Sequence, residues 1–279
     1  MMNMNRTRLF ILSILMLAVS CTSQTYEWKT ESMDGSRTGC LAVSGENVNE
    51  ALGCFQEDGT YRTPNGNIYQ SSSTVAKVAS IVHGAQPKMA RVKTVIAYSE
   101  EEMPTAKHET KLSNWVVDFV MQKVASLSGK RVDVGICNFG GIRVDMPQGN
   151  VILDDMLSMF PFKNTLVYLE LKGSELRKIF EKMAATTFQA VGGVEILVEN
   201  KQLTKALIGG KPIEDDKLYG VATISFLLYG GDSLTLAENA VNMQVYDVLI
   251  IDAALGHIAS LKAHGKNITA PAVTHVTIK

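Results

Sequence analysis

The sequence predicts an α/β protein of the layered α+β type, in which packed helices cover a mixed sheet. From residue 73 onward, short runs rich in β-branched residues alternate with longer segments whose apolar residues recur at helical spacing. Hydrophobic residues make up 46% and charged residues 20% of the 279 residues, which is ordinary for a globular protein with a sizeable core. Alternation of this kind builds layers of helices against a sheet.

The first 21 residues are expected to direct export and to lie outside the fold. Arg6 and Arg8 precede the apolar stretch LFILSILMLAVSC, which is short for a membrane span and typical of a secretory signal. Cys21 ends this stretch in a pattern similar to a bacterial lipoprotein processing site, although Leu17 stands one position too early. Lipidation of Cys21 and plain signal cleavage both stay open. Either predicts an exported protein, periplasmic or in the cell envelope, and lipidation would anchor it to the membrane.

Residues 22–72 are predicted to form hairpins and loops. They are rich in Gly, Ser, Thr and Asn, and their Asp-Gly and Asn-Gly pairs mark tight turns. The segment is either a small β subdomain or an extended arm. Cys40 and Cys54 would close a short disulfide loop in an oxidising compartment, and the alternative is two unpaired cysteines.

Residues 73–279 are predicted to form the main domain. STVAKVASIVHGAQPKMARV has Ser/Thr caps and spaced apolar residues, and KTVIAYS is a strand. Apolar residues from Leu112 to Leu127 define an amphipathic helix, and VDVGIC is a short buried strand in which Cys137 is a small hydrophobe. Then ILDDMLSMF is a short helix, NTLVYLELKG a long strand and SELRKIFEKMAA a capped helix.

The last third of the chain continues the alternation. VEILVE and LYGVATIS are predicted strands. VYDVLIIDAALGHIASLKAHG is predicted as one helix, and AVTHVTIK as a final strand.

Three loops at the ends of these elements carry groups suited to a nucleotide: NFGGIR, FPFKN and SFLLYGGD. Arg143 offers a planar fork of donors that matches phosphate. Phe162 and Phe226 offer flat faces for a base, and Asn164 and Asp232 offer short hydrogen-bonding groups. Ligands of α/β sheets gather at strand ends, so these loops are the candidate site. Taken singly, each residue has an ordinary alternative as a turn, core or capping residue.

The stretch NFGGIRVDMPQGNVILDDMLSMFPFKNTLVYLELKGSEL resembles the C-terminal, substrate-binding domain of the 5'-nucleotidase family. That family has an Asn-x-Gly-Gly-Ile-Arg loop followed by Pro-Phe-x-Asn. LYGVATISFLLYGGDSL is similar to its second signature, an aromatic residue before a Gly-Gly-Asp turn, and HETKLSNWVVD is similar to its upstream helix opening. The resemblance runs from about Val92 to the C-terminus, in the family's order and spacing.

The resemblance implies a role for each candidate residue. Arg143 would hold the phosphate or ribose-phosphate end, and Phe162 and Phe226 would sandwich the base. Asn164 would hydrogen-bond the base, and Asp232 the ribose. The remaining substrate-binding positions in the first loop are Asn138, Gly140 and Gly141.

Two positions depart from the family pattern. Lys107 lies where the family brings an arginine before the helix, so it supplies charge without a planar fork. Ser225 stands where an asparagine usually precedes the second phenylalanine. We therefore expect Lys107 to contact phosphate through a single ammonium group in place of the arginine's planar fork.

The family carries out hydrolysis in a separate N-terminal domain, where two divalent metals activate water. The ligand motifs of such a site are missing from this sequence, which has no Asp-x-His and no Gly-Asn-His. Asp154 and Asp155 are adjacent on a predicted helix and point apart. No Gly-x-Ser-x-Gly elbow and no Walker loop occurs. We expect no catalytic residues, no metal ligands and no cofactor in this chain. The five scattered histidines are expected to be structural or exposed: His83, His108, His257, His264 and His275.

The charge balance, with 27 basic and 28 acidic residues, argues against a nucleic-acid polymer as partner. The sequence favours the exported nucleotide-recognition component of a split 5'-nucleotidase, which binds nucleotide for hydrolysis by a separate dimetal phosphatase chain. The alternatives are a nucleoside- or nucleotide-binding lipoprotein without catalytic role, and a structural remnant. The preferred base, sugar and phosphate ester stay open.

Overall fold

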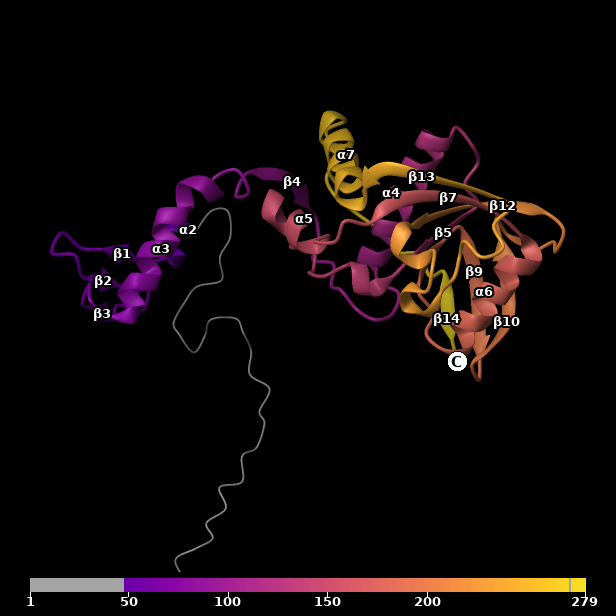
Figure 1. Ribbon diagram of the computed structural model, residues 1–279, viewed down its shortest axis with the longest axis horizontal. Coiled ribbons are helices and arrows are strands. Elements are labelled where there is room, and N and C mark those ends of the chain that lie inside the picture. The colour runs from indigo at the N-terminus through magenta and orange to yellow at the C-terminus, as the bar shows by residue number, and fades with distance from the viewer. Residues whose placement is uncertain (1–47, 271) are drawn as a thin grey trace, which may run out of the picture. The chain divides into compact units, whose positions relative to one another are not determined.

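The computed structural model describes residues 48–270 and 272–279, so the export segment with Cys21, and also Cys40, lie outside the described residues. The described chain divides into two compact units, with Asn49–Ala76 in one and Lys77–Lys279 in the other (Figure 1). Each is described by itself. Among the helices of these residues, none combines the length and apolar character needed to cross a membrane.

Short antiparallel strands build the smaller unit. Helix α2 (Val48–Ala51) begins the described chain. A three-stranded sheet follows, made of β1 (Cys54–Phe55), β2 (Tyr61–Arg62) and β3 (Ile68–Tyr69). Tyr61 donates its hydroxyl to the carbonyl of Leu52 at 2.6 Å. The predicted hairpins are therefore present where the structure describes this segment, and the pairing of Cys54 with Cys40 stays a prediction.

A five-stranded mixed sheet forms the centre of the larger unit. Its strand order is β13-β7-β12-β5-β8, and all neighbours are antiparallel except β12 and β5, which run parallel. All four residues of β5 are buried, as expected of a central strand. The strands are β13 (Asn242–Leu249), β7 (Thr165–Lys172), β12 (Leu218–Ile224), β5 (Val134–Cys137) and β8 (Ala190–Gly192).

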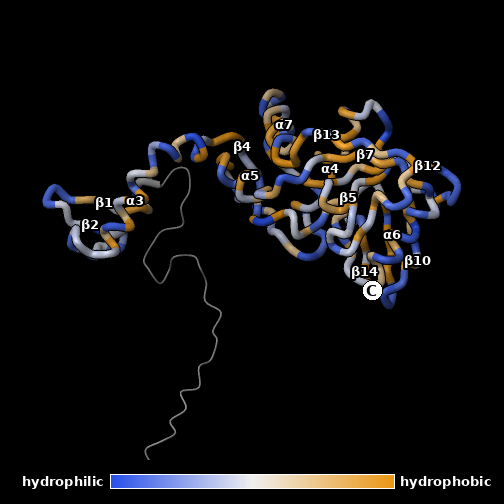
Figure 2. The backbone as a smooth tube through the Cα atoms, viewed as in Figure 1, coloured by the Kyte–Doolittle hydropathy of each residue, from blue (hydrophilic) through white to orange (hydrophobic). Residues whose placement is uncertain are grey.

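Helices cover this sheet with their apolar faces. Helix α4 (Lys111–Ser128) packs on β5, β7, β8 and β12, and it begins with a capping box between Thr110 and Ser113. Helix α6 (Gly173–Ala185) packs on β7 and helix α7 (Ile250–Ala263) on β13. The remaining helices are α3 (Thr74–Met89) and α5 (Leu153–Met159). Figure 2 shows hydrophobic residues along β7 and hydrophilic residues at the outer turns beside β12 and β10. The core thus lies between α4 and the sheet.

A second, four-stranded sheet has the order β11-β10-β9-β14, with β14 parallel to β9. Its strands are β11 (Lys211–Pro212), β10 (Gln202–Ile208), β9 (Val194–Glu199) and β14 (Val276–Ile278). Helix α6 packs on β10 and also on β7 of the central sheet. A separate antiparallel pair consists of β4 (Val95–Ser99) and β6 (Gly149–Ile152).

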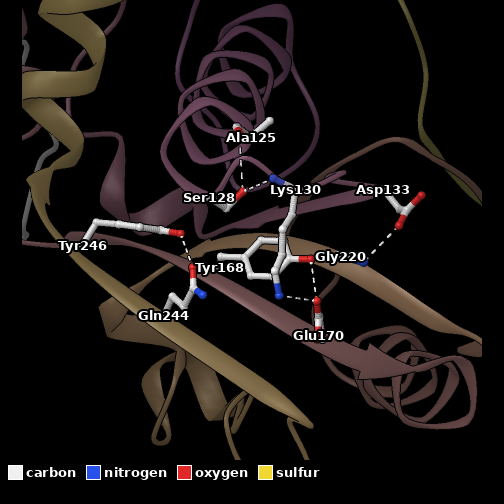
Figure 3. Close-up of polar contacts among 9 residues, drawn as sticks. All are labelled: Ala125, Ser128, Lys130, Asp133, Tyr168, Glu170, Gly220, Gln244 and Tyr246. Carbon is white, nitrogen blue, oxygen red and sulfur yellow. Dashed lines mark hydrogen bonds and ion pairs between the residues drawn. The ribbon is translucent and has the colours of Figure 1, made fainter.

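A polar network holds the edge of the central sheet where β5 begins (Figure 3). Lys130, just beyond α4, places its Nζ 2.8 Å from Oε1 of Glu170 and 5.3 Å from the centroid of the Tyr168 ring. The Tyr168 hydroxyl donates to the same Glu170 oxygen at 3.1 Å. Asp133 accepts a hydrogen bond from the backbone N–H of Gly220 at 2.9 Å. These contacts fasten α4 and β5 to β7 and β12.

The prediction of one helix for residues 245–265 is wrong. Its first residues belong to β13, and the helix begins only at Ile250. Strand β13 is an edge strand, which leaves Met243 and Val245 exposed, so its apolar residues do not follow a simple alternation. The Asp252 carboxylate accepts from Leu249 N at 3.3 Å and marks the true helix start.

Candidate functional site

The three predicted loops meet at one edge of the central sheet because of strand direction. Strands β5 and β12 are parallel neighbours, so the loops that follow them leave from the same edge, and antiparallel β7 begins there. The hydroxyl of Ser225 accepts a hydrogen bond from Thr165 N at 3.0 Å. Ser225, which stands where the family usually has asparagine, therefore links the FPFKN loop to the loop of Phe226.

The first loop forms a single 3-10 turn (η1, Phe139–Gly141) directly after β5. Asn138 is buried, and a Cβ added at Gly141 would lie 2.7 Å from its Oδ1, so a larger residue there would displace the Asn138 side chain. That Oδ1 is buried without a hydrogen-bond partner within the part of the chain that the structure describes. Gln189 accepts from Phe139 N at 3.1 Å and fixes the turn from the side of β8. The loop thus carries an acceptor still open to a donor.

Arg143 is exposed at the end of the same loop. Its Nη1 donates to the carbonyl of Gly140 at 3.2 Å, and its Cζ lies 5.9 Å from the centroid of the Phe162 ring. These two contacts orient the guanidinium over an aromatic face. The other N–H groups of the guanidinium make no hydrogen bond to the described residues, so they are available to an anion.

The two phenylalanines lie at the surface instead of in the core. Phe162 is 47% exposed and Phe226 44% exposed, which is unusual for such large apolar rings. Gly231 packs on Phe226, since a Cβ added to it would lie 2.8 Å from Cδ1 of the ring and 2.0 Å from the Phe226 carbonyl oxygen. Asn164 is half-buried, and its carbonyl accepts from Ile250 N at 2.9 Å.

Asp232 lies on a tight turn whose backbone is strained. Asp232 has φ +46° and Ser233 φ +63°, in the left-handed region that glycine favours. Gly230 N donates to the carbonyl of Leu234 at 2.7 Å and closes the turn. The exposed carboxylate is thereby held at the loop tip.

A cleft of about 580 Å³ gathers most of the predicted polar residues, a size suited to a small ligand. Lys107, Gly140, Arg143 and Asp232 line it. A narrow crevice beside it is lined by Asn138, Gly141, Phe162 and Asn164 together with apolar neighbours. Phe226 lines neither hollow.

Sequence reasoning missed several residues of the cleft. Thr186, Thr187 and Gln189 come from the segment after α6, which has no recognisable pattern. Thr105 donates through both its N–H and its hydroxyl to Asp145, at 2.6 and 2.8 Å. Those bonds hold the segment of Lys107 near the loop of Arg143. Only proximity in the fold could have found these residues.

The described part of the chain has no cluster of metal ligands, and its buried cysteine is not ionised. Residues 48–270 and 272–279 contain no group of three or more His, Cys, Asp or Glu side chains placed to hold a metal ion. The described residues therefore do not fit the two metals, which the family resemblance assigns to a separate N-terminal domain. Burial raises the pKa of the Cys137 thiol to about 12, so this cysteine stays protonated in the core.

Comparison with known proteins places the chain in a family. Residues 88–239 match the family described as 5'-nucleotidase, C-terminal domain. The protein UshA of Yersinia enterocolitica is 31% identical over 113 residues, which are 39% of this chain and 20% of UshA. The apyrase of Tabanus yao is 29% identical over 170 residues, which are 50% of this chain and 31% of the apyrase. The chain thus spans less than a third of either relative.

Solved structures show the same fold. The 5'-nucleotidase precursor from Thermus thermophilus superposes with a TM-score of 0.64 at 21% sequence identity, over 81% of this chain and 48% of that one. The NAD nucleotidase NadN from Haemophilus influenzae gives a TM-score of 0.56 at 16% identity, over 78% of this chain and 47% of that one. The chain belongs to the 5'-nucleotidase C-terminal domain family.

Proposed function

We propose that this domain recognises a nucleotide at the sheet edge formed by β5, β12 and β7. The observation that carries the proposal is the convergence of two cations and a carboxylate on one cleft. Arg143, Lys107 and Asp232 line it together, and the exposed ring of Phe162 lies directly under the guanidinium. Phosphate, sugar and base each have a suitable group within this edge.

Each role follows from the chemistry of the side chain. Arg143 takes the phosphate through its free N–H groups, and Lys107 adds charge from the opposite segment. Asp232 accepts from ribose hydroxyls. Phe162 and Phe226 stack on the base, and Asn164 hydrogen-bonds its edge. The open acceptor on Asn138 takes a donor of the ligand or of an ordered water.

Hydrolysis, in this proposal, needs a second chain. A dimetal phosphatase would supply the metals and the activated water, while this domain positions the nucleotide. Export, and a lipid on Cys21 that anchors the chain to the membrane, complete the proposal. AMP hydrolysis by the pure chain with added divalent metal would contradict it.

Titration calorimetry of the mature chain with AMP and adenosine is the direct test. Arg143→Ala should weaken AMP by about tenfold or more and adenosine far less, because it removes a charge-assisted phosphate contact. Phe226→Ala should weaken both ligands by a similar factor. Arg91→Ala and Tyr229→Ala are matched controls, since both residues are exposed and line neither hollow. Unchanged AMP binding in Arg143→Ala would contradict the proposal.

The second candidate is a nucleotide-binding lipoprotein without catalytic role. It needs only the cleft lined by Arg143, Lys107 and Asp232, and no second chain. The two candidates differ in one measurement, in which a metallophosphatase domain of a relative is added to this chain. A rise in AMP hydrolysis that Arg143→Ala abolishes supports the split enzyme, and tight AMP binding without such a rise supports the binding protein.

A further inference from the structure

A large cavity in the described structure lies beside the nucleotide cleft. It encloses about 760 Å³ between the start of α4, the end of α6, β9 and the C-terminal strand β14. Its inner wall is apolar, with Phe188, Met183, Val198 and Val276 among the lining side chains. A hollow of this size and character takes a small organic molecule.

Cations surround the apolar wall. Lys107, Lys111, Lys201 and Lys279 all line the cavity. Lys111 pairs with Glu101 at 2.5 Å and Lys279 approaches Glu199 at 3.9 Å, but Lys107 and Lys201 have no ion pair with any described residue. Two positive charges therefore face the cavity without a counter-charge.

The one carboxylate in the lining is already engaged. Glu109 accepts hydrogen bonds from His275 N at 2.8 Å and from Val276 N at 2.9 Å, so its oxygens are occupied by the backbone that leads into β14. Its single negative charge is also outnumbered by the lysines of the lining. The cavity is left with a net positive wall. An anion is the ligand that complements it.

The backbone at Lys201 gives an independent indication. Asn200 and Lys201 form the two-residue turn between β9 and β10, with φ +51° and +61°. Turns of this type favour glycine at the second position, because a side chain there is strained. A lysine that keeps this strained position and lines the cavity points to a role for its charge.

We infer that this cavity is a second binding site, for a small organic anion with an apolar body, such as an aromatic carboxylate. The apolar group packs on Phe188 and Met183, and the anionic group meets Lys201 and Lys107. The site is distinct from the nucleotide cleft, since Lys201 and Lys279 line the cavity but not the cleft. The two hollows adjoin, so their ligands can influence each other. The residues that line both are Lys107, Phe139, Thr186, Thr187 and Gln189.

Calorimetric titration of the full mature chain with 2-naphthoate, and with neutral 2-naphthamide, tests the site. Naphthoate should bind about tenfold tighter than naphthamide, a difference typical of one charge-assisted contact. Lys201→Gln should remove most of that preference and leave naphthamide unchanged. Lys211→Gln is the matched control, because Lys211 is exposed in the same sheet and lines no part of the cavity.

A second variant separates charge from fold. Lys201→Gly relieves the backbone strain, so it should raise the melting temperature and still lose the preference for naphthoate. Arg143→Ala should leave naphthoate binding unchanged, and Lys201→Gln should leave AMP binding within about twofold, which distinguishes failure of this site from failure of the nucleotide cleft. Equal binding of the two naphthalenes, no binding of either, or equal effects of Lys201→Gln and Lys211→Gln would overturn the inference.

Discussion

The backbone of Gly141 lies so close to the side-chain amide of Asn138 that adding a methyl group to Gly141 would disturb the loop. A Cβ there would lie 2.7 Å from Asn138 Oδ1, in a buried setting. We expect Gly141→Ala to cost about 1–3 kcal/mol, the usual range for overpacking, and to abolish AMP binding. Urea unfolding and calorimetry measure the two effects.

Gly140→Ala is the control for this prediction. A Cβ at Gly140 would lie 3.4 Å from Asn138 Nδ2, an ordinary contact. It should therefore cost clearly less stability than Gly141→Ala. Equal costs for the two substitutions would mean that the contact with Asn138 does not shape the loop.

Tyr168 predicts how the protein responds to alkali. Burial, followed by the hydrogen bond to Glu170, raises the pKa of Tyr168 from its usual 10.0 to about 12. Between those values the unfolded chain loses the phenol proton while the folded chain keeps it, so this group's contribution to stability is complete below pH 10 and is lost as the pH rises to about 12. Tyr168→Phe should melt lower at neutral pH, because the bond to Glu170 is gone, but its melting temperature should fall less over this alkaline range.

Parallel curves for the wild type and Tyr168→Phe would contradict this assignment. All other ionisable groups are common to both proteins, so the difference between the curves isolates Tyr168. Tyr69→Phe removes a tyrosine hydroxyl at a half-buried position in the smaller unit, outside the network of Tyr168 and Glu170, and is the control for this comparison.

Among the elements, the C-terminal strand β14 pairs with β9 and is also held by a side chain from far earlier in the sequence. Glu109, just before α4, accepts from the backbone N–H groups of His275 and Val276. Glu109→Ala leaves these donors without their acceptor, which should cost about 1–3 kcal/mol. Hydrogen exchange of the amides in Val276–Ile278 should quicken, while that of β7 should follow global unfolding. Glu102→Ala, at an exposed position nearby, should change neither.

Elements with a clear local hydrophobic pattern could be predicted from the sequence. Elements that form only by pairing with a neighbouring strand could not. VEILVE is a short apolar run rich in β-branched residues and forms β9 with those bounds. By contrast, β8 has only three residues, all of them buried. Strand β10 has no regular hydrophobic pattern, and its residues range from exposed to buried. Residues 245–249 lie in edge strand β13, whose place beside β7 leaves apolar side chains exposed. These assignments come from tertiary pairing, which a local pattern does not contain.

The candidate site divides in the same way. The loops of Arg143 and Asp232 carry glycines and charges that are visible in the sequence, and the structure brings these residues to one cleft. Gln189 and Thr186 join the same cleft from a segment without any motif, because β8 lies next to β5. The large cavity was invisible to sequence reasoning for a similar reason, since its walls come from four separate elements.

For the whole molecule, the core belongs to one continuous part of the chain. Its buried apolar cluster runs from Met103 to Ala270. Ser73 caps α3 through a hydrogen bond from Ala76 N at 3.2 Å, so a chain of residues 73–279 keeps its first helix start. We expect this shortened chain to melt within about 4 °C of the mature protein, which corresponds to about 1 kcal/mol. A larger fall would show that the preceding residues support the domain.

The parallel pairing of β5 with β12 has a consequence for how the protein is made. Val134 pairs with Val221, so the loop of Arg143 emerges during synthesis long before the strand that supports it. The nucleotide cleft cannot exist in a nascent chain until β12 and the turn of Asp232 have been translated. In the proposed function, nucleotide would stabilise the finished protein but would not guide the early stages of its folding, which must close this long-range contact unaided.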